Sequence, residues 1–319
     1  MTGIRRLLIA IDGSDYAQRA VDFVGALAPE SGTELIILMV VEPLPPISIA
    51  RDPFFGSHTR ALIREYLEAQ RRTAKGVVDA AAALLRRPGV NVEVLVRLGT
   101  PKREIVRISR QRRSDLIVLG ARGLGGFMGL ALGSVSHYVA EHATASVLVV
   151  KAHDDAGVVP VGRPWRVVAA VDGSPRSDAV IAFIECLAWS DVVHVRVVTV
   201  GEVGRLVPPE VANAAERRAS QIAGHAVERL HAVFPGSEAV TRLGSAAAEI
   251  VELARTWPAD LVVVGTRGRS GLHATILGSV SRQILAHAPF SVCVARSADV
   301  AGSNDAQHPR GQALPRVAP

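Results

Sequence analysis

Two glycine-rich segments, one in each half of the chain, have the residue types and spacing of a phosphate-binding loop. Residues 120–123 have the pattern Gly-x-x-Gly, and Gly-Ser follows after nine further residues, at 133–134. Residues 265–268 and 278–279 repeat the pattern with the same spacing. Glycine lets main-chain N–H groups approach a ligand closely, and a helix N-terminus favours an anion. The two copies therefore predict a duplicated phosphate-binding site.

The repeat extends beyond these loops, to the apolar runs that lead into them. Each loop follows a short apolar run that begins after an aspartate, Asp115 or Asp260, and each precedes the helical sequence Gly-Ser-Val-Ser. Near the start of each half, Asp-Gly-Ser follows another apolar run, at 12–14 and at 172–174. The period is about half the chain, which is the size of a whole domain and not of a solenoid unit.

Apolar runs and helical segments alternate along each half, which predicts an α/β fold with a parallel sheet covered on both faces. The expected fold class is two tandem, open, doubly wound, five-stranded sheets. The expected strands of the first half are residues 7–11, 35–41, 92–96, 116–119 and 146–150, and those of the second are 167–171, 193–199, 238–241, 261–264 and 292–295.

The domain boundaries are predicted from composition. Residues 1–151 form a first domain, and the turn-rich residues 152–164 form a linker. Residues 165–297 form a second domain, and residues 298–319 form a tail that we expect to be disordered because it is polar and lacks periodicity.

Composition narrows the class of protein. Of 319 residues, 49% are hydrophobic but only 4% aromatic, so the cores must be aliphatic. No apolar run approaches the ~20 residues that span a bilayer, and the N-terminus lacks a signal-peptide core, so no membrane partner is expected. Cys186 and Cys293 are interpreted as buried thiols, which suits a reducing cytoplasm. The net charge of +6 is spread over helix surfaces, which disfavours a nucleic-acid partner.

These features predict an adenine-nucleotide site beyond the carboxyl ends of the strands, where the sheet order reverses. If the first strand lies beside the fourth, Asp12 faces the glycine loop and can accept a hydrogen bond from adenine or ribose. The Ser134 hydroxyl can donate to phosphate or touch magnesium. The candidate binding residues are Asp12, Gly13, Val41, Gly120, Arg122, Gly123, Gly133, Ser134 and Val135 in the first half, and Asp172, Gly173, Val200, Gly265, Arg267, Gly268, Gly278, Ser279 and Val280 in the second.

Simpler interpretations remain open for each motif. Asp-Gly-Ser after a strand can be only a turn and a helix cap, and Gly-x-x-Gly only a tight turn. Ser134 and Ser279 can be caps, and Arg122 and Arg267 exposed loop residues. The loops are not Walker motifs, because no Lys-Ser/Thr follows the glycines, and they follow the fourth strand, unlike the dinucleotide fingerprint.

The joint pattern resembles the universal stress protein family. It consists of the Asp-Gly-Ser opening, the Gly-x2-Gly-x9-Gly-Ser loop and the closing His-Ala-x3-Val-x-Val segment, and it covers residues 4–151 and 165–296. The loop spacing resembles that of the ATP-binding branch. The resemblance implies an adenine-nucleotide α-hydrolase-like sheet in the order 3-2-1-4-5, with the fifth strands paired in an intramolecular pseudo-dimer, with or without a homodimer. It also implies a cytoplasmic stress or regulatory protein that holds ATP, with magnesium, or acts through partners.

Three functional classes compete. The first is an ATP-binding regulator that is not an enzyme, because no water-activating base follows the loops and the histidines lack metal-ligand spacing; His142 and His287 are expected to cap helices. The second is a slow ATPase or an adenylating enzyme, although the Ser-Gly-Gly-x-Asp-Ser loop of adenylating enzymes is absent. The third is a scaffold that binds no ligand.

Overall fold

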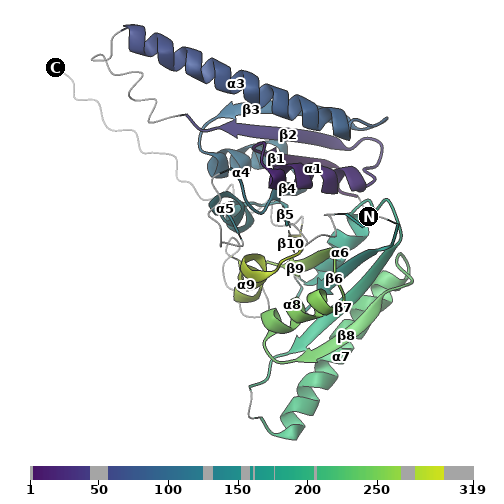
Figure 1. Cartoon of the computed structure of the whole chain (residues 1–319). Coiled ribbons are helices and arrows are strands. Elements are labelled where there is room, and N and C mark those ends of the chain that lie inside the picture. The colour runs from purple at the N-terminus through teal and green to yellow at the C-terminus, as the bar shows by residue number, and fades with distance from the viewer. Residues whose placement is uncertain are drawn as a thin grey trace, which may run out of the picture.

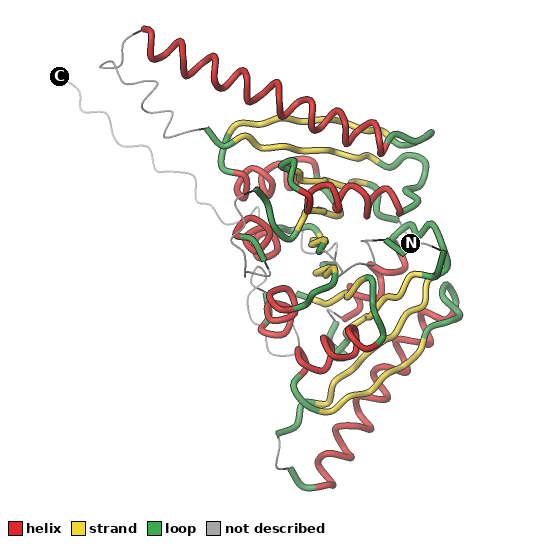
Figure 2. Tube along the Cα trace, viewed as in Figure 1, coloured by secondary structure: helices red, strands yellow, loops and turns green. Residues whose placement is uncertain are grey.

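The computed structural model describes residues 3–43, 57–124, 132–151, 159–160, 162–175, 177–204, 207–266 and 277–297 (Figures 1 and 2). Ten strands form one continuous mixed sheet in the order β3-β2-β1-β4-β5-β10-β9-β6-β7-β8. Each half therefore has the predicted internal order 3-2-1-4-5, and the two halves meet at their fifth strands. The predicted linker lies mostly outside the described residues, and the predicted tail, residues 298–319, lies outside them entirely.

The elements of the first half match the sequence prediction closely. Within this half, all paired strands are parallel. The elements are β1 (Arg6–Ile11), α1 (Asp15–Ala26), β2 (Glu34–Val41), α3 (Ser57–Leu85), β3 (Asn91–Leu98), α4 (Pro101–Arg112), β4 (Leu116–Gly120), α5 (Ser134–His142) and β5 (Ser146–Val150).

The second half repeats this succession. Its strands are also parallel to one another. The elements are β6 (Trp165–Ala170), α6 (Ser177–Cys186), β7 (Val193–Gly201), α7 (Pro209–His231), β8 (Glu238–Leu243), α8 (Ala246–Thr256), β9 (Leu261–Gly265), α9 (Ser279–His287) and β10 (Ser291–Ala295).

Apolar side chains on both faces of the strands build two cores, one on each side of the sheet. Along β1, Leu7 and Ile9 face the side covered by α1, α3, α6 and α7, whereas Leu8 faces the side covered by α4, α5, α8 and α9. Alternation along a strand sends successive side chains to opposite faces, so a strand covered on both sides must be apolar throughout. Both cores continue across the two halves, and α3 and α7 lie toward opposite ends of the molecule (Figure 1).

The predicted pseudo-dimer is confirmed, because β5 and β10 pair in antiparallel fashion, with Leu148 opposite Cys293. Two cations flank this seam, the buried Lys151 and the partly buried Arg296. The Nζ of Lys151 donates to the carbonyls of Leu285 and Ala288, each at 2.6 Å, at the C-terminal end of α9. The equivalent residue of the second half, Arg296, donates to the carbonyl of Ala140 in α5 at 2.6 Å. Each half thus supplies a cation to the carbonyl end of the other half's helix.

Burial changes the titration of both cations. Desolvation, with the nearby Arg122 charge, lowers the pKa of Lys151 to about 8. Desolvation also lowers the pKa of Arg296 to about 10. Both side chains keep hydrogen-bond acceptors inside the protein, which offsets part of the cost of burying a charge.

Aromatic rings form a second junction between the halves. Phe23 of α1 meets Trp165 edge-on at 5.2 Å between ring centroids, and Trp165 meets Trp189 at 5.4 Å. The backbone N–H of Ala28 also donates to the carbonyl of Ala188 at 2.9 Å.

Three smaller predictions have clear outcomes. Cys293 is buried, but the prediction for Cys186 is wrong, since this residue ends α6 and is only partly covered. His142 and His287 each place Nδ1 within 2.9 Å of a carbonyl in the preceding turn, as expected of residues at helix ends. None of the described helices combines the length and the apolar character that a bilayer crossing requires.

Candidate functional site

Asp12 lies at the carboxyl end of β1, between β2 and β4, where the connections of the first half diverge to the two sides of the sheet. Its Oδ1 accepts hydrogen bonds from the N–H of Ser14 at 3.0 Å and from the Ser14 hydroxyl at 2.6 Å. Its Oδ2 accepts from the N–H of Leu124 at 3.1 Å, so the carboxylate holds the start of the glycine loop. The predicted proximity of Asp12 to the loop is therefore present, and contacts within the chain already use both carboxylate oxygens.

Two glycines of the first loop are required by close packing. A Cβ on Gly123 would lie 2.3 Å from Asp12 Oδ2, and a Cβ on Gly120 would lie 2.7 Å from the backbone of Tyr16. Arg122, which lies between these two glycines in the sequence, is half-buried, and its guanidinium lies 5.6 Å from the centre of the Tyr16 ring. Arg122 therefore has a packing contact and is not a fully exposed loop residue. Its counterparts in the second loop, Arg267 and Gly268, lie outside the described residues.

The helices that follow the loops begin without a side-chain cap. The N-cap residues are Gly133 for α5 and Gly278 for α9, so Ser134 and Ser279 are the first helical residues and not the caps. The N–H of Gly133 donates to the carbonyl of Ala121 at 2.7 Å, and that of Gly278 donates to Thr266 at 2.6 Å. The N–H groups of the first turn, including those of Val135 and Val280, have no intrahelical partner and carry the positive end of the helix dipole.

The Asp-Gly-Ser turns serve both halves in related ways. Gly13 and Gly173 have φ values of 83° and 75°, which side chains other than that of glycine seldom adopt. Ser14 also caps α1, because its hydroxyl accepts from the N–H of Ala17 at 3.2 Å. The Asp-Gly-Ser segment of the first half therefore forms the turn and the helix cap that the simpler interpretation predicted, and it also borders the crevice.

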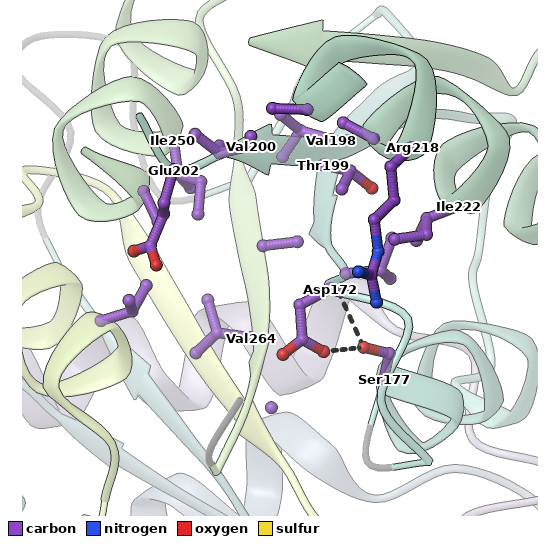
Figure 3. Close-up of a pocket in the computed structure, with 18 of the residues that line it drawn as sticks. Asp172, Ser177, Val198, Thr199, Val200, Glu202, Arg218, Ile222, Ile250 and Val264 are labelled. Carbon is purple, nitrogen blue, oxygen red and sulfur yellow. Dashed lines mark hydrogen bonds between the residues drawn. The ribbon is translucent and has the colours of Figure 1, made fainter. Parts of the chain in front are cut away.

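The crevice of the second half contains a cavity of about 800 Å³ (Figure 3). This volume lies within the range of small-molecule sites, ~300–1,000 Å³. Six predicted residues line it: Asp172, Val200, Gly265, Gly278, Ser279 and Val280. The seventh described candidate, Gly173, borders an adjoining cavity of about 400 Å³. The cavity extends from the N-terminus of α9, across the strand ends, to the side of α7.

Asp172 is held differently from Asp12. Its Oδ1 accepts from the N–H of Ser174 at 3.1 Å and from the Ser177 hydroxyl at 2.6 Å, and its own N–H donates to that hydroxyl at 2.9 Å. The sequence places Ala17 where the second half has Ser177. The hydrogen bonds between Ser177 and Asp172 therefore have no counterpart at Ala17 in the first half.

The end of the second strand differs from the expected correspondence by one residue. The carbonyl of Val41 accepts from the N–H of Gly99 at 3.1 Å, and that of Gly201 accepts from Gly244, also at 3.1 Å. Gly201 is therefore the structural equivalent of Val41, and Val200 corresponds to Val40. Val200 and Gly201 lie at the carboxyl end of β7, and both line the cavity.

Sequence reasoning missed several cavity residues, notably Thr199, Glu202 and Arg218. They lie at the end of β7 and on α7, away from the glycine motif. Helical spacing is the signal that could have found Arg218, since it shares one face of α7 with Val211, Ala215 and Ile222 at intervals of three or four residues.

The described residues contain no cluster of three or more His, Cys, Asp or Glu side chains suited to a metal ion. A magnesium ion bound to the described residues would therefore need some of its ligand atoms from outside the protein. Phosphate oxygens, with few protein ligands, are the usual arrangement for that ion.

Comparison with known proteins gives consistent matches. The sequence model of the universal stress protein family matches residues 3–151 and 165–296. The universal stress proteins Rv2623 and Rv1996 of Mycobacterium tuberculosis are each 31% identical to the chain and cover 91% of it, over 96% and 94% of their own lengths. The crystal structure of a universal stress protein from Archaeoglobus fulgidus aligns over 91% of this chain and 98% of its own, with a TM-score of 0.62 at 21% identity.

Proposed function

The chain belongs to the universal stress protein family, with one family domain in each half, and from that premise we propose that it is a nucleotide-binding regulator of the stress response. One observation supports this proposal above the others. In each half, a glycine-capped helix N-terminus lies beyond the carboxyl end of a central strand, where a phosphate would meet main-chain N–H groups. The expected ligand is ATP with magnesium.

The residues fit such a ligand by their chemistry. The first-turn N–H groups at Gly133, Ser134 and Val135 would hold phosphate oxygens, as would those at Gly278, Ser279 and Val280 in the second half. The Asp-Gly turns and the ends of β2 and β7 would border the ribose and the base. The 800 Å³ cavity, lined by aliphatic side chains together with polar ones such as Asp172, Ser177 and Ser279, has room for a purine nucleotide. Bound magnesium would neutralise phosphate charge.

We further propose that the protein binds and retains the nucleotide and is not an efficient enzyme. Asp12 accepts hydrogen bonds from Ser14 and Leu124, so its carboxylate is engaged in holding the loop. A general base must instead be within reach of the proton that it removes. Single-turnover assays with radiolabelled ATP test this point. Product formation within minutes at saturating protein would favour the slow-ATPase alternative.

The direct test is nucleotide content. Purified protein is denatured, and the released material is examined by absorbance and ion-exchange chromatography; the expected result is bound ATP or ADP. Nucleotide-free protein is then titrated with magnesium–ATP and magnesium–GTP by calorimetry. If the natively purified protein carried no nucleotide and the titrations showed no binding, the proposed function would be wrong, and the scaffold alternative would be favoured.

A further inference from the structure

The helices whose N-termini would meet the phosphates are short, and both lie next to the seam between β5 and β10 (Figure 1). α5 and α9 have nine residues each, so each is roughly 13 Å long. Helices of this length are marginal by themselves, and tertiary contacts decide their position. Contacts at the C-terminal end of each helix therefore help to determine where the N–H groups of its first turn lie.

The C-terminal end of α9 is held by a side chain of the first half. The last carbonyls of a helix have no partner within the helix. The buried ammonium of Lys151, which directly follows β5, donates to two carbonyls at this end, those of Leu285 and Ala288. The first half thus supplies donors that α9 cannot supply itself.

The second half makes the reciprocal contact. Arg296 directly follows β10, and its guanidinium donates to the carbonyl of Ala140 in α5 at 2.6 Å and to that of Ala145 at 3.1 Å. Ala140 and Leu285 are each the seventh residue of their helix. The two cations therefore reach equivalent carbonyls, and the exchange is symmetric about the seam.

Serines at the start of the seam strands hold the backbone of both cations. The N–H of Lys151 donates to the Ser291 hydroxyl at 3.3 Å. In the same way, the N–H of Arg296 donates to the Ser146 hydroxyl at 3.1 Å. Both serines are buried. Each cation thus leaves its strand from a position that the opposite strand fixes.

The N-terminal turn of each helix is attached to its own half. The Ser281 hydroxyl in α9 donates to the carbonyl of Gly265 at 2.6 Å, at the end of β9. The Ser136 hydroxyl in α5 donates to the carbonyl of Ala121 at 2.8 Å, just after β4. Each helix therefore extends from the glycine loop of its own half to a cation of the other half.

We propose that Lys151 and Arg296 are positioning residues, each of which fixes the phosphate-binding helix of the opposite half, so that neither nucleotide site is complete without the other half. The inference rests on the proposed function and concerns how the two sites depend on each other. A neutral side chain in place of either cation would leave buried carbonyls without a donor, which is costly. A shift of the helix that relieved this cost would also move the N–H groups at its other end.

The test measures each site separately in the full-length chain. Gly123→Glu leaves only the second site, Gly268→Glu leaves only the first, and calorimetry gives the affinity for magnesium–ATP. Lys151→Met should weaken the second site about tenfold, a size typical of coupling between distant sites. At the first site, where the Arg122 charge acts on Lys151, it should have a several-fold smaller effect. Arg296→Met should give the opposite pattern.

Exposed cations provide the matched controls. Lys75→Met and Arg255→Met remove the same charges from helix surfaces, where each residue pairs with a carboxylate of its own helix, and neither should change either affinity. Arg296→Lys supplies the type of cation that the first half uses, and it should keep most of the first-site affinity. Loss of that affinity in Arg296→Lys, as complete as in Arg296→Met, would contradict a role for the positive charge.

A chain with both loops intact guards against misfolding as an explanation. There, Lys151→Met should retain one site of nearly unchanged affinity and Arg296→Met the other, which shows that each variant is folded. Equal weakening of both sites by each cation variant, or no weakening at either site, would overturn the inference and leave the proposed function in place. Absence of nucleotide binding in the unsubstituted protein would overturn both.

Discussion

The two halves of the molecule share the backbone framework around the glycine loops and differ in the side chains beside the second strand of each half. In each half, a glycine is the N-cap of the last helix, and its N–H donates to a carbonyl just after the preceding strand. Each half also has an Asp-Gly turn in which the glycine has a positive φ. In the first half, Asp12 holds Leu124 of the loop; in the second, Ser177 holds Asp172 beside an open cavity. The backbone framework is thus the same in both halves, whereas side chains on β7 and α7 differ from those at the corresponding positions of β2 and α3.

The largest expected effect comes from a carboxylate in either loop. Gly123→Glu and Gly268→Glu should each remove about one bound nucleotide per chain, and the double variant should bind none. A Cβ at Gly123 would contact Asp12 directly, and an added negative charge among phosphates should weaken affinity about a thousandfold. Equilibrium dialysis with labelled nucleotide measures the stoichiometry.

The matched control for the loop variants is Gly76→Glu on α3, where an added Cβ meets no atom within 4 Å. It adds the same charge without touching the crevice, so its stoichiometry should equal that of the unsubstituted chain. Tight binding by the double variant, with an unchanged circular dichroism spectrum, would show that the loops are not the phosphate sites.

The two seam cations should respond differently to pH. The pKa of Lys151 is about 8 in the folded chain, below its ordinary 10.5, so the unfolded chain holds more protons between these values. Stability should therefore rise with pH across this window relative to Lys151→Met, by at most about 3 kcal/mol, with no such change below pH 8. Urea denaturation at pH 7, 8, 9 and 10 measures the difference.

Arg296→Met is the comparison for that experiment. Arg296 has a pKa of about 10, so this variant should keep the pH dependence of the unsubstituted chain between pH 8 and 9. Parallel stability curves for Lys151→Met and the unsubstituted chain would contradict a lowered Lys151 pKa.

Replacing Gly201 by valine, the residue of the first half, should be moderately destabilising. A Cβ there would lie 2.7 Å from Leu243 and 3.2 Å from Ala215, so the wall of the second cavity must shift. Overpacking of this kind costs about 1–3 kcal/mol, which the urea midpoint would report. Gly204→Val, where the nearest atom is 4.0 Å from the added Cβ, should have little effect. Equal stability of both variants would mean that the second wall tolerates the larger side chain.

The smallest effect is expected at Ser177. Ser177→Ala removes the two hydrogen bonds that join this hydroxyl to Asp172, while the first half has alanine at the equivalent position. The loss should be about 1 kcal/mol of unfolding free energy. Ser220→Ala, on the exposed face of α7, is the control. If both serine variants were equally stable, the hydroxyl of Ser177 would not be what holds Asp172.

The strands could be predicted from the sequence because each is a short apolar run bounded by turn residues, and the family resemblance supplied their order. The correspondence of Val41 with Gly201 could not be predicted, because a one-residue shift at a strand end changes the apolar pattern little. The hydrogen bonds from Gly99 to Val41 and from Gly244 to Gly201 establish it. Arg218 was missed as a cavity residue because its place in the lining depends on which face α7 turns toward the sheet. The Asp12–Leu124 contact joins residues 112 positions apart, beyond the reach of any local signal.

The pairing of β5 with β10 has a consequence for behaviour on dilution. Two separate domains joined through such a seam would dissociate as their concentration fell. Here a single chain carries both strands, so each meets its partner at an effective concentration on the order of millimolar, whatever the amount of protein present. The contact of the Lys151 ammonium with the carbonyl end of α9 therefore does not depend on the protein concentration. The seam should stay closed even where the protein is scarce.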